Sequence, residues 1–169
     1  MFRKLVSVSL ITMLTGCVLY PTTRDYYKPI VQVGQAKTAS SGCGYHKAKY
    51  DALEQAVGNI TVRVYPSLSS EKTLIVNFGL ESSQDSDHLK LNTVISNDVQ
   101  LNEESESLTL TSKYLHDGVY RTWYSSNAFQ LTDYPNQLMI SVSDSHGKTY
   151  QFMFEFTTQS DIYYASINC

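Results

Sequence analysis

Three consecutive residues, Asp144, Ser145 and His146, are of the types that make up a serine hydrolase triad. In such a triad the base must lie within hydrogen-bond distance of both the nucleophile and a carboxylate, so side chains from separate elements have to converge. Neighbours in a tight turn point in different directions and do not converge in this way. Because alternating apolar stretches flank the run on both sides, we predict that these three residues form a turn and are not catalytic.

The other residues that could bind a metal ion are dispersed along the chain. They are His46, His88 and His116, the pair Asp85 and Asp87, and the group Glu103, Glu104 and Glu106. The histidines lack HExxH spacing, and the acidic groups lack the glycine and terminal glutamate of a calcium loop. We interpret the acidic groups as solvated loops whose charge keeps a sheet edge from pairing. No phosphate-binding glycine loop and no GxSxG motif is present, so we expect no metal, no other cofactor and no enzymatic activity.

The first residues of the chain have the composition of an export signal. Arg3 and Lys4 precede an apolar run from Leu5 to Leu14, which is shorter than the roughly 20 residues that cross a bilayer. The run leads into "LTGC", Leu14 to Cys17, where a small pair of residues precedes a cysteine.

Residues 1–17 resemble the signal of bacterial lipoproteins. The resemblance implies cleavage between Gly16 and Cys17, a diacylglyceryl thioether on Cys17, and acylation of its new amino group. Val18 occupies the sorting position and is not Asp, which implies an outer membrane location, facing the periplasm. Two or more acyl chains hold a protein stably on a membrane, at about 0.8 kcal/mol per buried methylene. A plain secretory signal and an unmodified cysteine are the alternatives.

Two cysteines, Cys43 and Cys169, remain after this cleavage. Disulfides persist in exported proteins, so we predict that the two are bonded. Such a bond closes a loop of more than a hundred residues, worth about 4 to 5 kcal/mol by chain-entropy estimates. Two free thiols, or a metal site that uses Cys43 and His46, are the alternatives.

The charge of the chain argues against a nucleic-acid partner. Loss of residues 1–16 would remove two basic residues, Arg3 and Lys4, and no acidic one, so the formal net charge would fall from −3 to −5. Nucleic-acid binding depends on clustered Lys and Arg, and the sequence has no such cluster.

In the last two thirds of the chain, apolar residues recur at every second position. The clearest strands are expected at residues 60–65, 74–81, 108–111, 138–143 and 150–157, and weaker ones at 89–96, 99–102, 120–125 and 162–167. Turns are expected at 116–118 and 144–147. This pattern predicts a mainly β protein, an antiparallel, immunoglobulin-like β-sandwich, with a small antiparallel barrel as the alternative. Leu110 and Phe154 are predicted to face its core, and Trp123 is interpreted as a core aromatic.

The residues before these strands receive a different interpretation. Pro and Gly interrupt residues 17–42, which we interpret as a lipidated tether with one short edge strand at 30–33. The helical spacing of Tyr50, Leu53 and Val57 predicts one short helix over residues 46–57. Residues 43–169 are expected to form a single β-sandwich domain.

The chain is unusually rich in tyrosine, with 13 residues of this type. Tyr114, Tyr120, Tyr124 and Tyr163 are candidates for exposed aromatic binding residues, and one of Tyr163 and Tyr164 should face the core. Tyr20, Tyr26 and Tyr27 could lie at lipid headgroup level. Stabilising cross-strand ring pairs are the alternative.

These observations lead to three hypotheses about function. The first is a non-enzymatic interaction or accessory module of the cell envelope, anchored to a membrane through lipid on Cys17, with an envelope protein or a glycan as its partner. The second is a carbohydrate-binding or peptidoglycan-binding lipoprotein. The third is an enzyme, or an inhibitor of a periplasmic enzyme.

Overall fold

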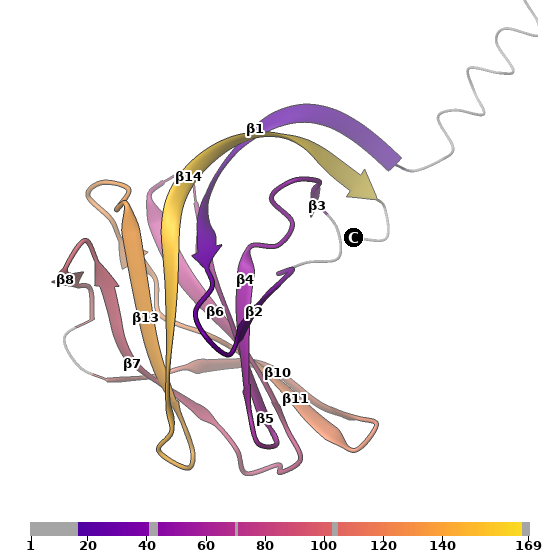
Figure 1. The fold of residues 1–169 in the computed structure, drawn as a ribbon, viewed down its shortest axis with the longest axis vertical. Helices are drawn as coiled ribbons and strands as arrows, with labels where there is room; N and C mark the ends of the chain where they lie inside the picture. The colour runs from indigo at the N-terminus through magenta and orange to yellow at the C-terminus, as the bar shows by residue number, and fades with distance from the viewer. Residues whose placement is uncertain (1–16, 41–43, 70, 103–104, 167–169) are drawn as a thin grey trace, which may run out of the picture.

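The chain forms two antiparallel β-sheets packed face to face (Figure 1). The computed structural model describes residues 17–40, 44–69, 71–102 and 105–166. Sheet A has the strand order β1-β14-β13-β7-β8, with β3 paired to β14 and β9 paired to β7. Its strands are β1 (Cys17–Ile30), β3 (Gly44–Tyr45), β7 (Leu89–Ser96), β8 (Val99–Gln100), β9 (Glu106–Ser107), β13 (Gln137–Asp144) and β14 (Thr149–Ser166).

Sheet B has the order β10-β11-β6-β5-β4-β2, with β12 paired to β6. Its strands are β2 (Gln35–Thr38), β4 (Ala52–Val57), β5 (Ile60–Leu68), β6 (Thr73–Ser82), β10 (Thr109–His116), β11 (Val119–Ser125) and β12 (Phe129–Gln130). The expected antiparallel β-sandwich is therefore confirmed. Its strand order, with a meander of β4, β5 and β6 in one sheet, differs from the ABED and CFG sheets of a constant-type immunoglobulin domain.

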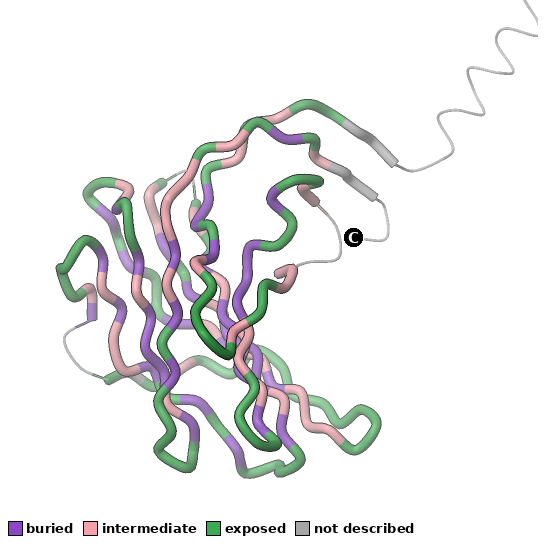
Figure 2. The backbone as a smooth tube through the Cα atoms, in the orientation of Figure 1, coloured by how far each residue is buried: buried purple, intermediate pink, exposed green. Residues whose placement is uncertain are grey.

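The core lies between the inner faces of the two sheets (Figure 2). Alternating side chains of β5, β6, β13 and β14 fill it, as the period of two predicts. Phe154 is fully buried there, as expected. The largest fully buried side chains of the core are those of Tyr27, Tyr150, Phe78, Phe152, Phe154, Leu53, Leu74, Leu80, Leu91, Leu138 and Ile140.

Both expected turns are present as hairpins. Asp117 and Gly118 join β10 to β11 with φ of 52° and 76°, the two positive values that a type I′ turn requires. The turn after Asp144 joins β13 to β14, and Asp144 accepts hydrogen bonds of 2.9 Å from the backbone N–H groups of His146 and Lys148. This carboxylate fixes the turn by the Asx mechanism.

The interpretation of residues 17–42 as a tether is corrected by the structure over residues 17–38. β1 pairs with β14 along its whole length, from Cys17 opposite Ser166 to Ile30 opposite Met153. β2 then pairs with β4, and residues 31–34 form the turn between β1 and β2 instead of an edge strand. Pro21 and Pro29 lie in β1. They are tolerated there because β1 is the outer strand of sheet A, so the N–H groups along one of its edges have no partner strand among the described residues.

The predicted helix at residues 46–57 is also wrong, because Ala52–Val57 is strand β4. Gly58, with φ of 62°, turns the chain so that Val57 pairs with Ile60 and β4 forms a hairpin with β5. Only Leu53 of the three residues with helical spacing enters the core, whereas Tyr50 and Val57 are exposed. Pairing with β5 thus outweighs the local helical pattern.

Two of the expected core positions are corrected as well. Leu110 lies on the same side of its hairpin as the buried Tyr124, but β10 is the outer strand of sheet B and Leu110 is 56% exposed. Trp123 lies on the outer face of sheet B and is only half-buried. The core side chains of β11 are instead its neighbours Thr122 and Tyr124.

Candidate functional site

The four tyrosines proposed as an aromatic binding set do not come together. Tyr114 lies on the outer face of β10, opposite Arg121. Tyr120 lies on the other face of the same hairpin, where its ring centroid is 5.8 Å from Lys113 Nζ. Tyr124 is buried in the core and is corrected as a binding residue. Tyr163 is on β14 in the other sheet. Burial and sheet membership thus separate the four tyrosines.

The Asp144, Ser145 and His146 run does not form a nucleophile and base pair. Ser145 Oγ donates to Asp87 Oδ1 at 2.8 Å, and His146 Nε2 lies 3.2 Å from the same oxygen. Serine and histidine therefore both bind one carboxylate, instead of binding each other as a triad requires. These residues are turn residues, as predicted.

Asp87 is buried, which its solvated-loop interpretation did not anticipate. The hydroxyl of Ser82 also donates to it, so the carboxylate joins the end of β6 in sheet B to the hairpin turn of sheet A. The hydrogen bond from Ser82 is the main cause that lowers the pKa of Asp87, and the contacts with Ser145 and His146 add to it against the opposing effect of burial. Asp85 points elsewhere and forms an ion pair of 2.7 Å with Lys113, so the two aspartates do not share a cation.

This lowered pKa predicts a pH-dependent stability. A carboxylate whose pKa is lower in the folded than in the unfolded protein stabilises the fold above the unfolded value, about 3.9, and this contribution is lost as the pH falls through the folded value. Urea unfolding of wild type and Asp87→Asn should show the variant less stable at pH 6 and less sensitive to acidification below about pH 4. Parallel pH profiles for the two proteins would contradict this assignment.

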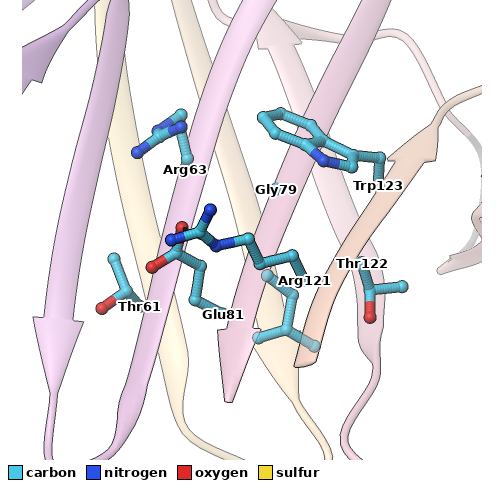
Figure 3. Close-up of a pocket in the computed structure, with 8 residues that line it drawn as sticks. Thr61, Arg63, Gly79, Glu81, Arg121, Thr122 and Trp123 are labelled. Atoms are coloured by element: carbon cyan, nitrogen blue, oxygen red, sulfur yellow. Dashed lines mark ion pairs between the residues drawn. The ribbon is translucent and has the colours of Figure 1, made fainter. Parts of the chain in front are cut away.

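A second group of polar residues surrounds Trp123 on the outer face of sheet B (Figure 3). The register places Arg63, Gly79 and Trp123 opposite one another on β5, β6 and β11. The indole lies against Gly79, where an added Cβ would come within 3.0 Å of the ring. Glycine in the interior of β6 therefore makes room for the tryptophan to lie flat on the strand.

Two arginine and glutamate pairs flank this ring. Arg63 forms an ion pair of 3.0 Å with Glu54, and Arg121 forms one of 3.3 Å with Glu81. The Arg63 guanidinium carbon lies 5.9 Å from the Trp123 ring centroid, at the outer limit of a cation–π contact. We call Thr61, Arg63, Glu81, Arg121 and Trp123 the Trp123 surface. Sequence reasoning missed it, although a glycine inside an alternating strand was a signal of close packing.

The outer strand of sheet B, β10, has all eight of its residues exposed. One edge pairs with β11, and no strand in the described part of the chain pairs with the other edge. Leu110 and Leu115 are opposite Tyr124 and Tyr120 and therefore share one face, while Tyr114 lies on the other face and is 47% exposed. β10 thus combines free backbone hydrogen-bonding groups with exposed apolar side chains on both faces.

No family model, curated protein or solved structure matches this chain. Within the described residues, no three His, Cys, Asp or Glu side chains are grouped so that they could hold a metal ion. The same part of the chain contains no helix long and apolar enough to span a membrane.

The Cys17 end of the sandwich forms a third group of contacts. Arg24 donates to Asp51 Oδ2 and to the carbonyl of Ala48, both at 2.6 Å, and its guanidinium lies over the ring of Tyr45 at 4.2 Å. Tyr26 and Tyr27 are buried, so their expected position at lipid headgroup level is corrected.

The loop that follows β3 is fixed to β14 by a buried carboxylate. Asp161 accepts hydrogen bonds from the backbone N–H groups of Lys47 at 2.9 Å and Ala48 at 2.8 Å. Burial alone would raise the pKa of Asp161, but these backbone donors outweigh it and hold the pKa below its usual value. The carboxylate is therefore ionised near neutral pH and keeps the loop at a defined position on the strand.

Several predicted residues lie outside the described residues. Cys43 and Cys169 fall in the ranges 41–43 and 167–169, so their disulfide stays a prediction. The acidic residues Glu103 and Glu104, and the cleavage residue Gly16, are also outside. For Cys17 the backbone is described, as the first residue of β1.

Proposed function

We propose that this chain is a lipoprotein of the bacterial outer membrane, anchored through lipid on Cys17 and facing the periplasm. The mature part acts as a non-enzymatic interaction module that binds an extended segment of a partner protein along β10. The "LTGC" signal, Leu14 to Cys17, supports the anchor.

The observation that carries the interaction function is the edge of β10 with which no described strand pairs. An exposed sheet edge can accept a strand of another protein, because its free N–H and C=O groups continue the hydrogen-bonded ladder. Proteins that avoid such pairing place charges along the edge, but Lys113 is held in an ion pair with Asp85. Leu110 and Leu115 on one face, and Tyr114 on the other, supply apolar contacts to alternate side chains of an added strand.

The position of β10 is compatible with a membrane anchor. The tip of the β10–β11 hairpin and the Cys17 end of β1 lie far apart along the long axis of the molecule (Figure 1). A protein held at Cys17 therefore presents β10 away from the bilayer, where a periplasmic partner can reach it.

Crosslinking in intact cells tests this function. A photo-reactive amino acid placed at Ser112 or Tyr114 of β10 should give an adduct with the same partner protein, and the matched position Gln151 on β14 should not. The adduct should be lost when Leu110 and Leu115 are both replaced by Asp, since the added strand then loses its apolar contacts. Equal adducts from Gln151, or adducts that survive the double substitution, would contradict binding along β10.

A glycan ligand is a second candidate function, favoured by the Trp123 surface. Aromatic rings flanked by polar side chains suit sugar faces, and Trp123 is the single tryptophan of the chain. Its fluorescence should therefore report binding of peptidoglycan fragments directly. A saturable change that Arg121→Ala weakens strongly would favour this second function, and an unchanged spectrum would argue against it.

A further inference from the structure

The proposed anchor is attached to the folded sheet without a linker. Cys17 is already opposite Ser166 in the ladder between β1 and β14, and the pairing continues from there without a break. A strand rises about 3.3 Å per residue, so Tyr20 lies about 10 Å from Cys17 along β1. Lipid on Cys17 would therefore bring this end of the sandwich directly to the bilayer surface.

Three tyrosines lie next to one another at this end. Tyr20 is opposite Tyr163, and Tyr163 is opposite Tyr45, so the residues form a row across β1, β14 and β3. The ring centroids are 5.3 Å apart for the first pair and 5.1 Å for the second. We call these three residues the anchor-end cluster.

The geometry of the anchor-end cluster fits a lipid surface better than a sugar. The rings are inclined to one another by 39° and 75°, so they pack against each other and do not form a flat stacking platform. Tyr20 is nevertheless 45% exposed. Tyrosine rings with an apolar body and a polar tip are favoured at the boundary between acyl chains and water.

The loop after β3 adds positive charge beside the cluster. Lys47 and Lys49 are exposed, and Lys49 lines the same hollow as Tyr45 and Tyr163. Asp161 fixes this loop to β14, so the lysines keep their position relative to Cys17. Residues 44–50 contain no acidic residue, and Asp51, which lines the same hollow, is neutralised by its ion pair with Arg24, whereas the processed chain as a whole would be acidic. Anionic headgroups would therefore attract this end of the protein and repel most of the rest.

We infer that the anchor-end cluster and the adjacent lysines bind lipid headgroups, so that the sandwich stands on the membrane in one orientation. The headgroup layers add about 5 to 8 Å to each side of the hydrocarbon core, which is comparable to the distance from Cys17 to Tyr20. The inference rests on the proposed lipidation of Cys17. It goes beyond that proposal because an anchor alone would leave the protein free to tilt.

Depth-dependent fluorescence quenching tests this orientation. The full-length, lipid-modified protein is placed in vesicles of phosphatidylethanolamine and phosphatidylglycerol that contain a phospholipid brominated near the headgroup. In a Trp123→Phe background, Tyr20→Trp gives a single reporter in the cluster. Tyr114→Trp gives a matched reporter of nearly equal exposure, 47% against 45%, on β10. Tyr163→Trp, at the centre of the same row, replaces the first reporter if Tyr20→Trp does not fold.

Strong quenching and blue-shifted emission are expected at position 20, with little change at position 114. Lys47→Glu combined with Lys49→Glu should reduce the quenching at position 20. Equal quenching at both positions, or none at position 20 while the protein floats with the vesicles, would overturn the headgroup contact and leave the anchor intact. Protein that does not float with the vesicles would overturn the anchor itself, and the orientation with it.

Discussion

Replacement of Cys17 by alanine is expected to abolish incorporation of labelled fatty acid and to remove the protein from the outer membrane fraction. The acyl chains supply the affinity, at about 0.8 kcal/mol per buried methylene, and alanine has no sulfur to carry them. Cell fractionation of wild type and Cys17→Ala, with labelled palmitate as the second readout, measures the effect.

A matched control separates anchoring from folding. The same chain from residue 18 onward, exported behind an ordinary cleavable secretory signal, should be folded and soluble in the periplasm. This result is expected because the core residues of both sheets lie after Cys17. Retention of Cys17→Ala in the outer membrane, with no label incorporated, would contradict the role of this cysteine.

Phe154→Asp is expected to unfold the sandwich. The phenyl ring is fully buried among core residues of both sheets, and β14 pairs with both β1 and β13 at this position. Loss of a buried phenylalanine side chain costs about 3 to 5 kcal/mol, and an unpaired buried carboxylate adds several more. The total approaches the whole stability of a typical domain, about 5 to 15 kcal/mol. Urea unfolding followed by circular dichroism measures this loss.

Leu110→Asp is the comparison variant for this prediction. Leu110 belongs to an alternating stretch, as Phe154 does, but its exposure of 56% means that aspartate stays in water. Its effect on the free energy of unfolding should be within about 0.5 kcal/mol. Similar destabilisation by both variants would show that β10 is covered in the folded protein.

Alternation of apolar residues was sufficient to predict the strands that have one face in the core. β5, β6, β13 and β14 follow it closely, and the sandwich architecture follows from their number and hairpin spacing. β1 was missed because Tyr26 and Tyr27 are adjacent and both buried, which breaks the alternation, and because Pro21 and Pro29 are tolerated only at an edge.

The sites were harder to predict than the strands, because they depend on register between strands distant in sequence. Tyr20, Tyr45 and Tyr163 meet across three strands, yet Tyr163 follows Tyr20 by more than a hundred residues. Leu110 lies on the predicted face of its strand, but alternation alone does not reveal that β10 is an exposed outer strand. The helical spacing around Leu53 was misleading, since the pairing of β4 with β5 decides the conformation there.

Mass spectrometry of the processed protein tests the lipid anchor most directly. We predict an amino-terminal peptide that begins at Cys17 and carries a diacylglyceryl group on its sulfur and an acyl chain on its amino group. A processed protein whose first residue is any other, or whose Cys17 carries no lipid, would contradict the account.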